Sequence, residues 1–391
     1  MLYCRLLIVF ILSFSVLFGG CSSPRPVAAE SAAPKDNNYK SNVPHSREAN
    51  DAARFLAGLP GTEGSPYASL EATDAWKEHQ RLLDAIWKEA EAAQFPGLRK
   101  FQSDELNDPA LAGRTVFYPF SGPDALTVTS YFPHNPLYVM VALEPAGTLP
   151  TPKQIGKKEL PAYLAAIRDT MESELGRSFF ITRQMDRQFR GQVTDGLLAP
   201  ILQLLVRTGH TVLGFRYVRL DEMGEVIDRA VDYKAPTRYG NKGVEIEFQT
   251  DADSSLHRML YFSVNISNDR MKENTPFQKY LGQLTGVVSM LKATSYMPHH
   301  PGFSMISEAL LADSYAILQD DSGLPYKKFT PEQWKVQLYG DYIKPYGSFS
   351  WLEQPDLREA YKTAGAKPLP MHVGYGYRRI TSNLLLATRL K

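Results

Sequence analysis

The residues best suited to acid–base chemistry lie in one acidic stretch, Asp320-Asp321-Ser322-Gly323. Two neighbouring carboxyl groups can share one proton, so that one serves as an acid and the other as a base. Asp and Gly are also typical of tight turns, because they tolerate the left-handed backbone that such turns require. The stretch Asp221-Glu222-Met223-Gly224 follows an earlier predicted strand in the same way, which favours a turn. We therefore predict a turn at Asp320 and Asp321, with an active or binding site as the alternative.

Three further groups are candidate catalytic or ligand-binding residues. Ser121-Gly122-Pro123-Asp124 combines turn residues with a hydroxyl and a carboxyl group, and the alternative is that Asp124 only bonds to the neighbouring backbone. The pair His299-His300 is flanked by prolines, which predicts a solvated loop, with a ligand-contact or proton-transfer role for His300 as the alternative. Arg378 follows two tyrosines and could bind a carboxylate or a phosphate beside them.

The sequence lacks the motifs of metal and cofactor chemistry. It has no His-Glu-x-x-His pair, too few cysteines for a four-thiolate zinc site, and no glycine-rich phosphate loop after a predicted strand. Ser289-Met290-Leu291-Lys292 has the Ser-x-x-Lys spacing of penicillin-binding enzymes, but their serine opens a helix and Ser289 lies inside a predicted one. We therefore predict no metal, no cofactor and no serine nucleophile.

The N-terminus has the layout of an export signal. Residues 1–5 carry one positive charge, residues 6–18 are apolar, and two glycines precede Cys21. Residues 17–21 resemble a bacterial lipobox, which implies cleavage before Cys21 and attachment of a diacylglycerol to its sulfur. The same resemblance implies, through Ser22, sorting to an outer membrane, with the folded body in the periplasm or at the cell surface. A secreted protein without the lipid, or an uncleaved anchor, is the alternative.

Composition restricts the partners of the chain. Its 391 residues include 43 Lys and Arg against 42 Asp and Glu, so no excess of positive charge predicts nucleic acid as a partner. Residues 22–50 are rich in Ser, Pro, Ala and Asn, which predicts a flexible tether. We expect a signal peptide over residues 1–20, a lipidated cysteine and tether over residues 21–50, and contact with the membrane through the lipid on Cys21.

The rest of the chain predicts an α+β fold of antiparallel hairpins and packed helices. Residues 51–119 form an N-terminal helical region, and residues 126–132 and 137–144 are strand-like runs around a turn, typical of a hairpin. The order hairpin, helix, helix, strand is predicted twice, in a first half (residues 120–240) and a second half with a C-terminal extension (residues 241–391). The alternative is that this order arises by chance. The other predicted elements are helices over residues 160–175, 197–205, 277–291, 303–312 and 356–363, and strands over residues 211–219, 244–250, 256–266, 314–319, 339–343 and 371–380.

Two stretches of the folded body, Phe120-Ser121-Gly122-Pro123-Asp124 and Leu318-Gln319-Asp320-Asp321-Ser322-Gly323, resemble exported bacterial proteins of unassigned function. This resemblance implies no activity. We predict a binding or structural module of the cell envelope, whose partner is an envelope protein, a peptide or a glycan. The alternative is an envelope hydrolase that acts on glycan or peptide through Asp320, Asp321 and either Asp124 or His300. An enzyme should gather such groups around one pocket, whereas a binding module should expose a wide aromatic or apolar patch.

Overall fold

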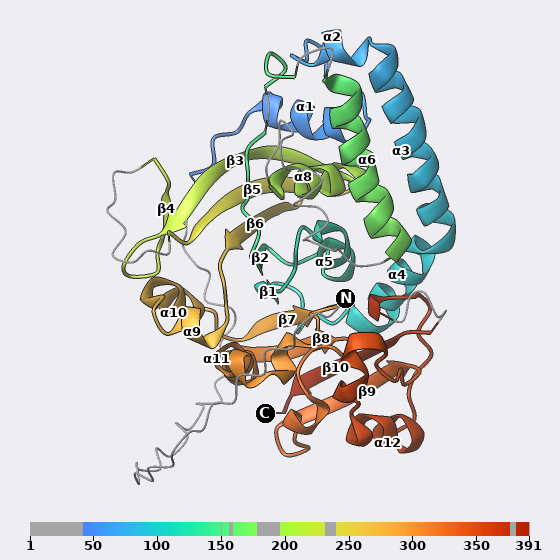
Figure 1. Cartoon of the computed structure of the whole chain (residues 1–391), viewed down its shortest axis with the longest axis vertical. Helices are drawn as coiled ribbons and strands as arrows, with labels where there is room; N and C mark the ends of the chain where they lie inside the picture. Colours follow the sequence, from blue (N-terminus) through green and yellow to red (C-terminus); the bar gives the residue numbers. More distant parts are fainter. Residues whose placement is uncertain are drawn as a thin grey trace, which may run out of the picture. The chain divides into compact units, whose positions relative to one another are not determined.

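Ten strands form one mixed sheet, in the order β4-β3-β5-β6-β2-β1-β7-β8-β10-β9 (Figure 1). The structure is a computed structural model that describes residues 42–149, 151–155, 159–177, 196–230, 240–375 and 381–390. The strands are β1 (Val116–Pro119), β2 (Leu137–Ala142), β3 (His210–Leu220), β4 (Val226–Asp228), β5 (Lys242–Thr250), β6 (Leu256–Ser263), β7 (Val287–Leu291), β8 (Ser314–Gln319), β9 (Trp334–Gly340) and β10 (Asn383–Arg389).

The centre of the sheet is parallel. Strands β6, β2, β1, β7 and β8 run side by side in one direction, while β5, β3 and β4 extend one flank and β10 and β9 extend the other through antiparallel pairs. Parallel strands are buried on both faces, so they consist of nearly continuous apolar residues. Val116–Pro119 and Val287–Leu291 are buried along their whole length, as this position in the sheet requires.

Helices cover both faces of the sheet, because successive side chains of each strand point to opposite sides. In β1, Tyr118 belongs to the apolar core beneath α1, α3, α4, α5, α6 and α8, and its neighbour Phe117 belongs to the core beneath α9, α10, α11 and α12. Figure 1 shows the first group of helices above the sheet and the second below it. The helices are α1 (Arg47–Leu56), α2 (Ala68–Glu71), α3 (Asp74–Ala93), α4 (Phe95–Phe101), α5 (Ala125–Tyr131), α6 (Leu160–Arg177), α8 (Leu198–Arg207), α9 (Asn268–Met271), α10 (Thr275–Leu281), α11 (Ser304–Asp313) and α12 (Pro355–Thr363).

The predicted α+β class is confirmed, and the sheet is mixed rather than built from antiparallel hairpins. The predicted hairpin over residues 126–144 is wrong, because residues 125–131 form α5 and β2 is parallel to β1. The β-branched residues of this segment predicted a strand. The Asp124 side chain accepts a hydrogen bond from the backbone N–H of Thr127 at 3.1 Å and so begins a helix, which provides the crossover that a parallel pair needs.

The predicted helix over residues 277–291 is also wrong in its second half. Helix α10 ends at Leu281, Gly286 turns the chain with a φ of 62°, and residues 287–291 form β7. Ser289 therefore lies in a strand, where its Oγ is 2.7 Å from that of Ser314. A short apolar run fits a helix and a buried strand equally well, and its place beside β1 decides between them. Without the first hairpin, and with β7 in place of the end of a helix, residues 120–240 and 241–391 do not repeat one order of elements.

The ordered chain begins earlier than the predicted boundary at residue 51. Val43 is buried, Ser46 caps helix α1 by accepting the N–H of Glu48, and the His45 Nε2 lies 2.6 Å from the Glu247 carboxylate on β5. The small alanines on the buried face of α1 gave this segment the composition of a linker. Residues 22–41 of the predicted tether lie outside the described residues.

Most other predicted elements are confirmed with shifted ends, while two differ at the C-terminal side. The predicted strand over residues 339–343 is β9 at Trp334–Gly340, and residues 371–375 of the predicted strand 371–380 are irregular. Residues 376–380 lie outside the described residues. Strand β10, between β8 and β9, was not predicted.

Candidate functional site

The candidate site lies at the carboxyl ends of the parallel strands β1, β7 and β8. The chain passes from β1 through α5 to β2 on one side of β1, and β7 and β8 lie on its other side. In open sheets of parallel strands, ligands bind outside the carboxyl ends at the point where the strand order reverses. The segments that follow β1, β7 and β8 are therefore the first place to search for a function.

The predicted site residues fall mostly at this edge of the sheet. Ser121 and Asp124 follow β1, His300 lies in the segment after β7, and Asp320 and Asp321 follow β8. The structure connects Asp124 and Asp320 through one lysine, whereas Ser121 only donates to the Gly122 carbonyl at 2.9 Å. The other predicted positions, Arg378 and Cys21, lie outside the described residues.

The strongest contact at this edge is a buried ion pair between Asp124 and Lys292. The Lys292 Nζ lies 2.5 Å from the Asp124 Oδ2 and donates to the Thr127 Oγ1 at 2.8 Å. The Tyr118 hydroxyl donates to the same Asp124 oxygen at 2.9 Å, while Asp124 Oδ1 caps α5. Charges so far from water persist only when they are paired and hydrogen-bonded. The pair therefore joins the loop after β1 to the loop after β7.

Asp320 forms the turn that the sequence predicts. Its Oδ1 accepts hydrogen bonds from the backbone N–H and the hydroxyl of Ser322, at 3.0 and 2.5 Å, and its Oδ2 accepts the N–H of Ala293 at 2.8 Å. Burial raises the pKa of the Asp320 carboxyl above its usual value, and the hydrogen bonds and the charge of Lys292 oppose this rise. The carboxylate thus holds the loop after β7 against the loop after β8.

Asp321 points to the other face of the same turn. Its Oδ2 accepts a hydrogen bond from the Tyr296 hydroxyl at 2.5 Å, and its Oδ1 accepts one from the Asn383 amide at 3.2 Å. Burial, together with the neighbouring charge of Asp320, raises the pKa of Asp321 to about 7. One proton is therefore readily taken up by this pair of carboxyl groups near neutral pH, as paired carboxyls allow.

The histidine pair divides between the protein interior and solvent. His300 is exposed, and its Nδ1 accepts the backbone N–H of Gly302 at 3.0 Å, as expected for a loop residue. His299 packs edge-on against Tyr296, with ring centres 5.3 Å apart, and burial lowers its pKa to about 4. His299 is therefore neutral at physiological pH, and the structure gives His300 no contact with the acidic turn.

Backbone strain is concentrated at this edge of the sheet. Phe120 after β1 has a φ of 62°, and Ala293, Ser295 and Tyr296 after β7 have φ values of 51°, 56° and 55°. Residues other than glycine adopt this left-handed region rarely, at a cost of about 1–3 kcal/mol each. The Tyr375 hydroxyl braces the second loop, because it donates to the Ala293 carbonyl and accepts the Ser295 N–H, each at 2.9 Å. Such strain clusters at binding and catalytic sites.

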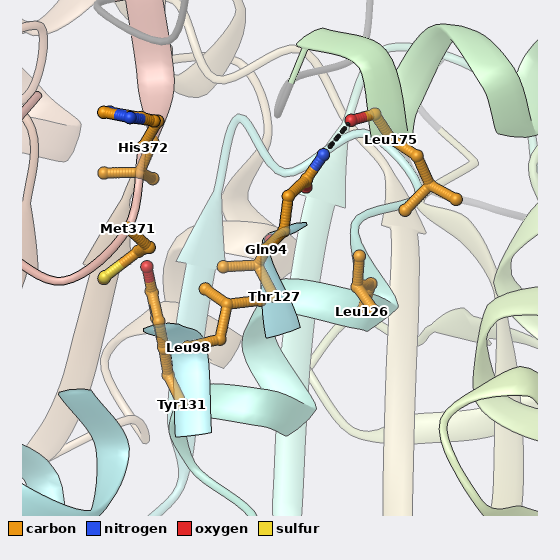
Figure 2. Close-up of a pocket in the computed structure, with 9 residues that line it drawn as sticks. Gln94, Leu98, Leu126, Thr127, Tyr131, Leu175, Met371 and His372 are labelled. Atoms are coloured by element: carbon orange, nitrogen blue, oxygen red, sulfur yellow. Dashed lines mark hydrogen bonds between the residues drawn. The ribbon is translucent and has the colours of Figure 1, made fainter. Parts of the chain in front are cut away.

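A cleft opens beside the ion pair, between helices α4, α5 and α6 and the segment 371–373. It holds about 350 Å³ of empty space, part of it open to solvent. Figure 2 shows Tyr131 and Met371 on one side of this cleft, Gln94 and Leu175 on the other, and Thr127 between them. The cleft is lined by Gln94, Leu98, Leu126, Thr127, Tyr131, Leu175, Met371, His372 and Val373.

Tyr131 is the unusual member of this lining. Its side chain is fully buried, and its hydroxyl has no hydrogen-bond partner among the residues that the structure describes. A buried hydroxyl without a partner costs about 1–3 kcal/mol. The cleft therefore contains a polar group that a molecule entering it would satisfy.

The aromatic residues of the C-terminal region belong mainly to the core. Phe329, Trp334 and Tyr339 are buried, whereas Trp351 is 74% exposed and Tyr346 is partly exposed. These two exposed rings belong to one segment of the surface, residues 346–352. They do not amount to the wide aromatic patch expected of a surface-binding module.

Sequence reasoning missed Lys292, Thr127 and Tyr131. Lys292 entered only as the end of a Ser-x-x-Lys spelling, and the other two were assigned to a strand. The available signal was the position of Lys292 immediately after an apolar run, since polar residues that end a buried parallel strand lie at its ligand-binding edge.

Within the described part of the chain, no three His, Cys, Asp or Glu side chains are grouped as metal ligands. In the same part of the chain, no helix has the length and apolar character needed to cross a bilayer. Comparison with family models, with curated proteins and with solved structures finds no match to this chain.

Proposed function

We propose that this protein is a lipid-anchored cell-envelope protein whose folded body binds a small molecule in the cleft beside β1, β7 and β8. The proposal refines the binding module predicted from the sequence, because it moves the site from an exposed surface to the carboxyl edge of the sheet. The resemblance of residues 17–21 to a lipobox supports the anchor.

The observation that carries the binding proposal is the strained backbone after β1 and β7. Four residues other than glycine, at about 1 kcal/mol or more each, together cost a considerable part of the 5–15 kcal/mol that stabilises a domain. They are Phe120, Ala293, Ser295 and Tyr296. A turn could be formed there by glycine at lower cost. Strain that the fold itself does not need is typical of a site that holds its groups ready for a ligand.

The binding proposal is tested with methionine methyl signals. Met371 lines the cleft, and Met223, which is 62% exposed, lies in the turn between β3 and β4 at the far flank of the sheet. Protein labelled at its methionine methyl groups is titrated with a fragment library of cationic, neutral and anionic small molecules. We expect some compounds to shift the Met371 signal, assigned with Met371→Leu, and to leave Met223 unchanged. If no compound of any class shifts Met371 selectively, the binding proposal is wrong.

The anchor is tested separately at Cys21. Cys21→Ser should abolish labelling by a fatty-acid probe and release the protein from the membrane fraction, because the lipid is attached to the cysteine sulfur. Ser22→Ala is the matched control and should remain labelled. A Cys21→Ser protein that still incorporates the probe contradicts the assignment.

A hydrolase is the second candidate, favoured by the acidic turn. Asp320 and Asp321 line a smaller hollow of about 210 Å³ with Tyr326 and Gln354. A carboxyl group whose pKa is about 7 is suited to exchange a proton at neutral pH. The binding module stands first because the oxygens of both carboxyl groups already accept hydrogen bonds within the protein. Hydrolysis of peptidoglycan fragments by the wild type, lost in Asp321→Asn at an unchanged melting temperature, would reverse this order.

A further inference from the structure

We infer that the ligand of the cleft is an amphipathic primary amine, with its ammonium group at the Tyr131 hydroxyl and its apolar part against the leucines. This inference rests on the proposed binding function and adds the chemical class of the ligand. It applies equally to a free amine and to the amino group of a larger molecule.

The first argument is the charge behind the cleft. The carboxyl groups of Asp124, Asp320 and Asp321 are 1%, 3% and 7% exposed, and the Lys292 side chain that faces them is 4% exposed. When all four groups are ionised, they carry an excess of negative charge. Burial makes such an excess costly, and a cation or a proton placed close by relieves it. A positively charged ligand is therefore favoured at this edge, and an anion is opposed.

The second argument is Tyr131 itself. This side chain is 1% exposed, lines the cleft and has a hydroxyl oxygen with no partner among the described residues. Asp124 and Asp320 both act on this hydroxyl, since their charges add to burial in raising its pKa. The oxygen thus lies in a negative potential, where it can accept a hydrogen bond from an ammonium N–H.

The third argument is the lining of the rest of the cleft. Leu98 of α4, Leu126 of α5 and Leu175 of α6 contribute apolar side chains, and Met371 and Val373 contribute two more from the covering segment. An apolar surface of this kind gains free energy when it covers a hydrocarbon chain. A short branched alkyl amine combines both requirements, whereas a fully polar cation leaves the leucines without a partner.

The experiment compares three probes of one shape and different charge: isoamylamine, isoamyl alcohol and isovalerate. Each is titrated into the full chain, and its dissociation constant is taken from the shift of the Met371 methyl signal. We expect isoamylamine to bind at least about tenfold more tightly than the other two, because only the ammonium is attracted by the buried carboxyl groups. If the alcohol or the acid binds as tightly as the amine, the inference is wrong and the binding function stands.

Variants of two tyrosines assign the contact. Tyr131→Phe should weaken isoamylamine about tenfold, the usual effect of removing a hydrogen bond to a charged group, and should leave isoamyl alcohol nearly unchanged. Tyr315→Phe is the matched control, because Tyr315 lies at the start of β8, at the opposite edge of the sheet, and should leave both affinities unchanged. An unchanged amine affinity in Tyr131→Phe overturns the inference. Failure of all three probes, when other fragments still shift Met371, overturns the inference alone.

Discussion

Removal of the ammonium group of Lys292 tests whether the ion pair with Asp124 links the two loops. The Lys292 Nζ and the Asp124 Oδ2 are 2.5 Å apart, and both side chains are buried. At an effective dielectric constant of about 20, unit charges at such a distance attract by roughly 7 kcal/mol. The cost of removing both charges from water offsets most of this attraction, so the pair itself contributes little net stability.

Lys292→Met keeps the length of the side chain and leaves the Asp124 carboxylate buried without its cation. The carboxyl group can escape this state by taking up a proton, which at pH 7 costs about 4 kcal/mol for an ordinary aspartate. We therefore expect the free energy of unfolding to fall by about 3–5 kcal/mol at pH 7. At pH 5 the loss should be smaller by about 2.7 kcal/mol, because protonation then costs less.

The assay is urea denaturation of wild type and variants at pH 7 and pH 5, followed by tryptophan fluorescence. The control combines Asp124→Asn with Lys292→Met, because the new amide side chain keeps an oxygen that can cap α5 by accepting the Thr127 N–H. This double variant should recover most of the lost stability, because no buried charge is left unpaired. A double variant as unstable as Lys292→Met, or a loss that does not depend on pH, would refute the reasoning.

The remaining predictions concern the strained loop and the acidic turn. Ala293→Gly should raise the free energy of unfolding by up to about 1 kcal/mol in urea denaturation, because glycine adopts a φ of 51° without strain; a loss of stability would contradict the assignment of strain. The native state keeps the Asp321 proton up to about pH 7, whereas the unfolded chain releases it near pH 3.8, so stability should fall as the pH rises through this window. Asp321→Asn should flatten that slope, and thermal melts at pH 4 to 8 would contradict this by showing equal slopes. Asp320→Asn should cost about 1–3 kcal/mol, because its amide N–H₂ would face the N–H of Ala293 or Ser322, and an unchanged urea midpoint would argue against these contacts.

The sequence was sufficient where a structure depends on neighbouring residues. The periodicity of apolar residues predicts helices α3, α6, α8 and α11 in the right places, because a helix presents every third or fourth residue to the core. The acidic turn at Asp320 is predicted for the same kind of reason, since an Asp side chain bonds to the backbone two residues further on. The α+β class follows from such local signals.

Tertiary structure decided the rest, because strand pairing and burial are not local properties. Residues 125–131 look like a strand and are a helix, and residues 287–291 look like the end of a helix and are a central strand. In both cases the sheet selects between two conformations that the residues themselves allow. The parallel order then brings the loops after β1, β7 and β8 to one edge. Nothing near Asp124 in the chain indicates that Lys292 is its partner, since they meet only because β1 pairs with β7.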